Sequence, residues 1–186
     1  MDKKIVFLEG LPAVGKTTIK DEFKNIDGFC AVDEIINSSI FVCDNCTQND
    51  FMENDNMKVL STSCEKTAIV DRGPISTLAY NYTRHIIDPT FDFDIKEVEQ
   101  WFSSFENLLQ SKSVVVYFLT TNGKDYYLPY ENNLDPYGSV ENQKLLEAIT
   151  LFVCKKYCKN LVVKEYHKFN DMGELISEII NKFVCS

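Results

Sequence analysis

Arginine is scarce in this sequence. Only two of the nineteen basic residues are arginines, Arg72 and Arg84, whereas 28 residues are acidic, so the net charge is −9. A protein that binds a nucleic-acid backbone needs clustered positive charge to displace counterions. Nucleic acid is therefore not an expected partner, and few guanidinium groups are available for any phosphate-binding site.

Long hydrophobic runs are also lacking. The longest run covers residues 114–119, far short of the roughly eighteen apolar residues that a membrane span requires. The first four residues do not resemble a signal peptide, and the seven cysteines are odd in number and mostly scattered. These features indicate a cytoplasmic protein with reduced thiols and no membrane partner.

Short apolar runs alternate with segments of helical period along the chain. The runs predict strands at residues 4–9, 29–32, 68–71, 114–119 and 161–163. Helices are predicted over residues 16 to about 24 and from a start near residue 74. Three further helices are indicated by apolar residues that share one helical face: Ile95, Val98, Phe102, Phe105 and Leu109, then Leu145, Ile149, Phe152 and Val153, then Met172 to Phe183. Uniformly apolar strands between helices predict an α/β fold with a parallel sheet covered on both faces. No linker or repeat interrupts the pattern, so we expect a single domain over residues 1–186.

A phosphate-binding loop is predicted directly after the first strand. Its residues match the pattern G-x-x-x-x-G-K-[ST] at every fixed position and lie between a predicted strand and a predicted helix. In such loops successive backbone N–H groups surround the β- and γ-phosphates, the lysine contacts the phosphates and the hydroxyl binds Mg²⁺. The predicted ATP-binding residues are Gly10, Leu11, Pro12, Ala13, Val14, Gly15, Lys16, Thr17 and Thr18.

The third strand ends in Asp71-Arg72, at the sheet edge where ligands collect. Asp71 is predicted to bind Mg²⁺ together with Thr17, although it could also cap the following helix. Motor ATPases place a water-activating glutamate after this aspartate, whereas Arg72 suits anionic oxygens. The spacing of the glycine after Asp71 does not match that of GTPases. The residues at the end of the third strand therefore favour a kinase over a motor ATPase or a GTPase.

The sequence resembles the thymidylate kinase and deoxynucleoside kinase families. The resemblance rests on Glu9-Gly10, on Thr17-Thr18 and on the stretch from Asp71-Arg72 to Tyr80. It implies a three-layer P-loop NTPase fold with a five-stranded parallel sheet in the order 2-3-1-4-5. It also implies that the Asp-Arg pair binds acceptor and phosphates, and that a carboxylate after the second strand acts as base or acceptor ligand.

Asp33-Glu34 follows the second strand, and by this resemblance Glu34 is the predicted base, with Asp33 in reserve. A base is needed only if the acceptor is a hydroxyl, and the sequence leaves that open. Arg84 is a further candidate for the acceptor pocket, with a surface salt bridge as its alternative. The resemblance also implies a lid over about residues 120–138, normally rich in arginine, where Lys124 is the candidate phosphate ligand.

The expected function is ATP- and Mg²⁺-dependent transfer of the γ-phosphoryl group to a nucleoside or a nucleoside monophosphate. Lys16, Glu34, Asp71 and Arg72 are the predicted catalytic residues. Two alternatives remain: a P-loop kinase for another small alcohol such as an antibiotic or a sugar, and a nucleotide-binding regulatory module with little catalysis. The expected partner is a small-molecule phosphoryl acceptor, and a homodimer is possible.

Overall fold

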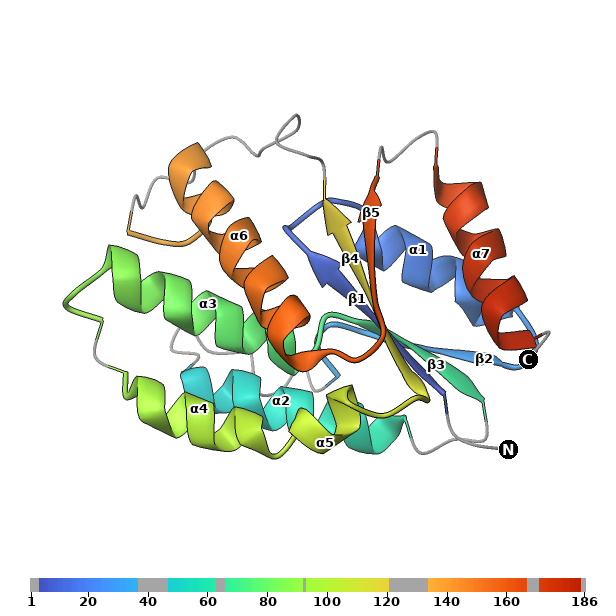
Figure 1. The fold of residues 1–186 in the computed structure, drawn as a ribbon, viewed down its shortest axis with the longest axis horizontal. Helices are drawn as coiled ribbons and strands as arrows, with labels where there is room; N and C mark the ends of the chain where they lie inside the picture. The colour runs from blue at the N-terminus through green and yellow to red at the C-terminus, as the bar shows by residue number, and fades with distance from the viewer. Residues whose placement is uncertain are drawn as a thin grey trace.

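The protein forms a five-stranded, entirely parallel sheet with the strand order β2-β3-β1-β4-β5 (Figure 1). The structure, a computed structural model, describes residues 4–36, 47–62, 66–91, 93–120, 134–166 and 171–184. The strands are β1 (Ile5–Gly10), β2 (Phe29–Val32), β3 (Thr67–Asp71), β4 (Val114–Thr120) and β5 (Leu161–Glu165). The predicted α/β class and strand order are confirmed.

Helices cover both faces of the sheet, which makes a three-layer arrangement (Figure 1). One face carries α1 (Lys16–Glu22) and α7 (Met172–Val184), with the short 3-10 helix η1 (Phe23–Asn25) following α1. The other face carries α2 (Gln48–Ser61), α3 (Pro74–Ile87), α4 (Ile95–Ser103), α5 (Glu106–Leu109) and α6 (Val140–Tyr157). None of the helices in the described part of the chain has the length and apolarity to cross a bilayer.

Alternate residues of the central strands pack into two separate hydrophobic cores, one on each face of the sheet. In β4, Val114, Val116 and Phe118 pack under α3, α4 and α6, whereas Val115, Tyr117 and Leu119 pack under α1 and α7. Side chains alternate between the two faces of a strand, so a strand buried on both sides must be apolar throughout. This is why the strands appear in the sequence as continuous apolar runs.

Two helical predictions need correction. The stripe from Ile95 to Leu109 is divided between α4 and α5, because the helix ends at Ser103 and restarts at Glu106. The hydroxyls of Ser103 and Ser104 donate to carbonyls three residues back, a local bond that competes with helical continuation.

The buried face of α6 also differs from the predicted one. Phe152 is 61% exposed, whereas Leu146, Val153 and Cys154 are buried. Thr150 lies on the same buried face, where its hydroxyl donates to the Leu146 carbonyl. A polar residue on the inner face and an aromatic residue on the outer face shift the apparent apolar stripe, so periodicity misplaced it.

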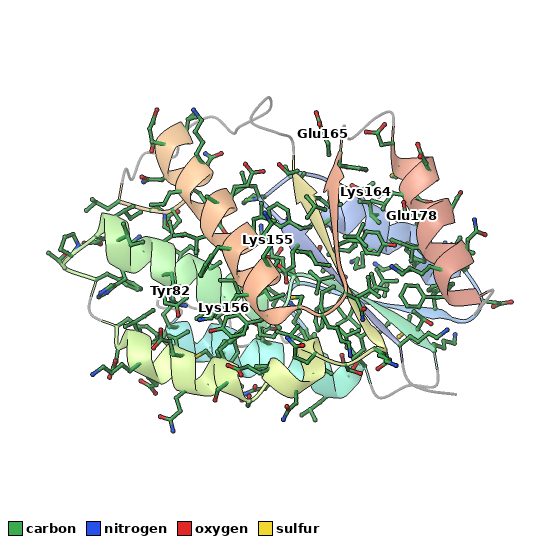
Figure 2. The ribbon with its side chains drawn as sticks, viewed as in Figure 1. Tyr82, Lys155, Lys156, Lys164, Glu165 and Glu178 are labelled. Carbon is green, nitrogen blue, oxygen red and sulfur yellow. The ribbon has the colours of Figure 1, made fainter. Side chains whose placement is uncertain are left out.

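Polar contacts join elements at the surface. Figure 2 shows Lys164 of β5 and Glu178 of α7 facing one another, and their charged atoms are 2.5 Å apart. On the opposite side of the sheet, the Tyr82 hydroxyl of α3 donates to Glu99 of α4 at 2.6 Å. Such exposed contacts contribute little stability individually, so the two cores dominate folding.

Gly73, the residue before α3, provides a test of the packing between β1 and β3. Its backbone is extended, but an added Cβ would lie 2.6 Å from Cδ1 of Phe7. We expect Gly73→Ala to destabilise the protein by about 1–3 kcal/mol, because the buried Phe7 ring must move. Gly173 in α7 has open space around it, so Gly173→Ala is the matched control and should cost nothing. Urea unfolding of both variants measures the difference, and equal stabilities would contradict this description of the packing.

Candidate active site

The loop between β1 and α1 curls at the carboxyl ends of the strands. Gly10 and Gly15 have φ values of 133° and 102°, a region that favours glycine, and Ala13 adopts a φ of 50°. A Cβ on Gly10 would lie 2.3 Å from the Leu119 carbonyl oxygen of β4, so only glycine fits there. The predicted loop therefore has the curled backbone that its sequence pattern requires.

Lys16 lies inside this loop and is almost fully buried. Its ammonium group donates to the carbonyl oxygens of Gly10 at 2.9 Å and Leu11 at 2.6 Å. Burial, together with repulsion by the nearby Arg72, lowers the pKa of Lys16 to about 7, although Asp71 and Glu34 partly oppose the shift. The lysine is thus held by backbone oxygens, which an incoming anion can replace.

Thr17 and Asp71 meet across the start of α1. The Thr17 hydroxyl donates to Oδ2 of Asp71 at 2.5 Å. The other oxygen, Oδ1, is buried and has no partner among the described residues. Asp71 does not cap α3, because the N-cap is Gly73 and no side chain caps that helix end. A hydroxyl beside a carboxylate with a free buried oxygen is a set of hard donors suited to Mg²⁺.

Arg72 directly follows Asp71 and faces Glu34. Its backbone has a φ of 57°, an uncommon conformation for a residue other than glycine. Its Nε is 2.9 Å from Oε1 of Glu34, an ion pair without an aligned hydrogen bond from Nε. Its Nη1 donates to the Tyr137 hydroxyl at 3.2 Å.

The two carboxylates after β2 have different surroundings. Glu34 faces Arg72, and its backbone is fixed by the buried Asn54 of α2, whose amide donates to the Glu34 carbonyl at 2.8 Å. Asp33 instead forms an ion pair with Lys20 of α1. Neighbouring residues at the end of a strand point in different directions, so one carboxylate reaches the site and the other does not.

These residues surround a cavity of about 250 Å³. It is lined by loop and helix residues together with two charged residues that follow β2 and β3: Pro12, Ala13, Gly15, Lys16, Thr17, Thr18, Glu34 and Arg72. Of the other predicted ligands, Gly10, Leu11 and Val14 belong to the loop but do not line the cavity, and neither do Asp33, Asp71 and Arg84. Asp71 is buried behind Thr17, to which it is hydrogen-bonded. Lys124 lies outside the described residues.

Arg84 belongs to a neighbouring polar cluster. Its guanidinium is 3.0 Å from Asp88 and 3.6 Å from Asp135, and it lies over the ring of Phe91. Asp135 also accepts the backbone N–H of Tyr137 at 2.8 Å. The structure therefore places Arg84 where it holds the segment that brings Tyr137 to Arg72.

No local sequence pattern predicts the contact of Tyr137 with Arg72, the contact of Asn54 with Glu34, or the burial of Glu9. Tyr137 is 65 residues from Arg72 and Asn54 is 20 residues from Glu34, so no local pattern links the partners. Glu9 is fully buried under the turn after β3, and its carboxylate accepts a hydrogen bond from Ser76 of α3. Burial raises the pKa of Glu9 to about 7, against the effects of Ser76 and Arg72.

Comparison with known proteins identifies the fold. No protein-family model and no curated protein sequence matches the chain. Solved structures do: thymidylate kinase from Ehrlichia chaffeensis has a TM-score of 0.57 at 14% identity, with 96% of this chain and 97% of that chain covered. Thymidylate kinase from Candida albicans has a TM-score of 0.57 at 15% identity, with 96% and 91% covered. This is a thymidylate kinase-like P-loop fold.

A third structure of this fold is the YorR protein of Bacillus subtilis, solved in complex with phosphorylated GDP. It has a TM-score of 0.56 at 13% identity, with 95% of this chain and 94% of that chain covered. At such identities the likeness establishes the thymidylate kinase-like fold alone. Activity depends on the residues of the site rather than on the fold.

The buried carboxyl of Glu9 predicts a specific pH dependence of stability. Its pKa rises from 4.5 in the unfolded chain to about 7 in the folded protein. The native state therefore binds more protons between these values, and this contribution to stability is lost as pH rises through 7. Glu9→Gln removes the effect, so the variant should gain about 3 kcal/mol relative to the wild type between pH 4.5 and 8.

Urea unfolding at a series of pH values measures this difference. Glu22→Gln is the matched control, because it removes the same type of charge from an exposed position on α1. Parallel stability curves for the wild type and Glu9→Gln would contradict the assignment of a buried, titrating carboxyl.

Proposed function

We propose that the protein is a Mg²⁺-dependent phosphotransferase that moves the γ-phosphoryl group of ATP to a nucleoside or a nucleoside monophosphate. One observation carries the proposal: a single cavity is lined by the phosphate-binding loop, by Arg72 and by Glu34. A donor loop, a guanidinium and a carboxylate on one cavity are the groups that phosphoryl transfer needs. The thymidylate kinase-like fold supports the choice of a nucleotide-type substrate.

On the donor side, Lys16 would exchange its carbonyl partners for phosphate oxygens. The backbone N–H groups of the curled loop would bind the same phosphates. Thr17 and Asp71 fit a magnesium ion, since Asp71 Oδ1 is buried and has no partner among the described residues. Such an ion would neutralise charge on the phosphates. The described residues contain no cluster of three or more metal-binding side chains, so phosphate oxygens and water would supply its remaining ligands.

On the acceptor side, Glu34 would act as general base toward a hydroxyl. Its carboxylate is half exposed at the cavity and is held by Arg72. An acceptor phosphate would have to compete with Glu34 for Arg72, whereas an acceptor hydroxyl would donate its proton to the carboxylate. The ion pair therefore favours a hydroxyl acceptor, that is, a nucleoside, over a monophosphate.

Arg72 would also stabilise charge on the transferring phosphoryl group. Of the two arginines, Arg72 lines the cavity, whereas Arg84 pairs with Asp88 and Asp135. A guanidinium at this position can increase phosphoryl transfer by about 10³ to 10⁵. Glu34 and Tyr137 hold Arg72 before any ligand arrives, which reduces the ordering that the reaction requires.

ADP release stimulated by one acceptor from a panel of nucleosides and nucleoside monophosphates tests the function. We expect Lys16→Ala to lower the stimulated rate about a thousandfold, because it removes the buried cation from the phosphate site. Lys155→Ala, on the exposed surface of α6 (Figure 2), is the control and should leave the rate unchanged. If neither nucleosides nor monophosphates stimulate ADP release while sugars or other alcohols do, the proposed acceptor class is wrong.

Comparison of Glu34→Gln with Asp33→Asn tests the base. With a hydroxyl acceptor, Glu34→Gln should lower kcat by about 10² to 10⁴ and leave ATP affinity unchanged. Asp33→Asn removes the neighbouring carboxylate, which pairs with Lys20, and should change kcat little. Rates at saturating ATP and acceptor measure kcat, and ATP titration measures affinity. Equal kcat values for the two variants would exclude Glu34 as base.

A further inference from the structure

Glu9 is a buried carboxylate that the proposed reaction does not use. It lies in β1 immediately before the phosphate-binding loop, is completely buried, and does not line the cavity. Oε2 accepts a hydrogen bond from Ser76 in the first turn of α3. Oε1 is buried without a hydrogen-bond partner among the described residues. A buried carboxyl group with one oxygen left without a hydrogen-bond partner requires an explanation.

The residues of β1 next to Glu9 contact the turn that carries Asp71 and Arg72. The backbone N–H of Arg72 donates to the Leu8 carbonyl at 3.0 Å. Gly73 lies against the Phe7 ring so closely that no Cβ fits, and Oε1 of Glu9 would be 3.5 Å from that Cβ. Phe7, Leu8 and Glu9 of β1 therefore lie against the turn formed by residues 71–74 and limit its conformation.

This turn has a strained backbone. Arg72 adopts a left-handed φ of 57°, which a side chain with a Cβ takes up only when its surroundings hold it there. The turn lets consecutive residues diverge, with Asp71 beside Thr17 and Arg72 beside Glu34. If the turn relaxed, Arg72 would leave Glu34 and the cavity.

Of the nearby cations, Arg72 opposes the raised pKa of Glu9 more than Lys58 of α2 and Lys16 of α1 do. Lys58 already has a buried acidic partner in Asp55, at 3.3 Å. The hydrogen bond with Cys158 and burial raise the pKa of the Cys154 thiol in α6, and Glu9 adds to this effect. Glu9 can therefore stabilise the position of Arg72 in two ways, by the attraction of opposite charges and by its hydrogen bond with Ser76.

We propose that Glu9 is a positioning residue that, through its hydrogen bond with Ser76, keeps turn 71–74 in the conformation that points Arg72 at Glu34 and the cavity. The direction of the Arg72 side chain is a property of the protein by itself, whereas the effect of Glu9 on turnover rests on the proposed function. Glu9 does not line the cavity, so it acts through the turn that carries Arg72.

The scarcity of arginine makes a direct test possible. Phenylglyoxal modifies arginine side chains, and peptide mass mapping can follow Arg72 and Arg84 separately because they are the only two arginines. At a pH above the pKa of Glu9, modification of Arg72 should become about tenfold faster in Glu9→Gln, since the hydrogen bond from Ser76 to a charged carboxylate is replaced by a weaker one to a neutral amide. Modification of Arg84 should remain as in the wild type, because its partners Asp88 and Asp135 are unchanged.

Ser76→Ala should reproduce the faster modification of Arg72 by removing the other half of the contact. Thr77→Val is the matched control on the same helix, since Thr77 bonds to Asp55 rather than to Glu9. If Glu9→Gln does not fold, Ser76→Ala decides the question. Wild-type reactivity of Arg72, or an equal increase at both arginines, overturns the proposal.

Turnover separates this inference from the proposed function. With an active wild type, Glu9→Gln should lower kcat about 10- to 100-fold, as outer supporting residues commonly do, with ATP affinity changed less than about twofold. A parallel loss of ATP affinity would overturn the positioning role. Selective exposure of Arg72 in a protein without acceptor-dependent turnover would support the positioning role and reject the proposed function.

Discussion

The pairing of β1 with β3 is the constraint on which the site depends. Leu8 is in register with Asp71, so β3 ends beside the point where β1 turns into the phosphate-binding loop. The Arg72 N–H continues this pairing by donating to the Leu8 carbonyl. Because side chains alternate along a strand, a shift of one residue would move Asp71 away from Thr17 and turn the apolar residues of β3 to the wrong cores.

The second constraint is the high density of charge in a largely buried space. Lys16 and Arg72 are both cations, and their repulsion contributes to the lowered pKa of Lys16. Asp71 at the end of β3 and Glu34 after β2 compensate them, and backbone carbonyls accept hydrogen bonds from the ammonium group. The site therefore consists of charges with replaceable partners, an arrangement suited to an anion.

Local signals determined much of this organisation. The central strands β1, β3 and β4 are buried on both faces and must be largely apolar, whereas β2 and β5 are partly exposed. All five could be located from their short apolar runs, with ends differing by one or two residues. The loop at residues 10–17 could be located because its glycines are required by backbone geometry. The parallel order brings Thr17, beyond β1, next to Asp71 at the end of β3. The alternation of exposed and buried residues in α6 was misassigned, because Thr150 packs inward and Phe152 outward.

Tertiary structure alone decided which polar residues share the site. Sequence placed Asp33 and Glu34 together after β2, but only the fold shows that Lys20 binds the first and Arg72 faces the second. Tyr137 reaches Arg72 from a distant segment, and Glu9 supports the turn from beneath it. Sequence by itself determined the strands and the phosphate-binding loop, because these depend on local backbone and burial requirements. The pairing of charges depends on side-chain directions in space, which neighbours in sequence do not specify.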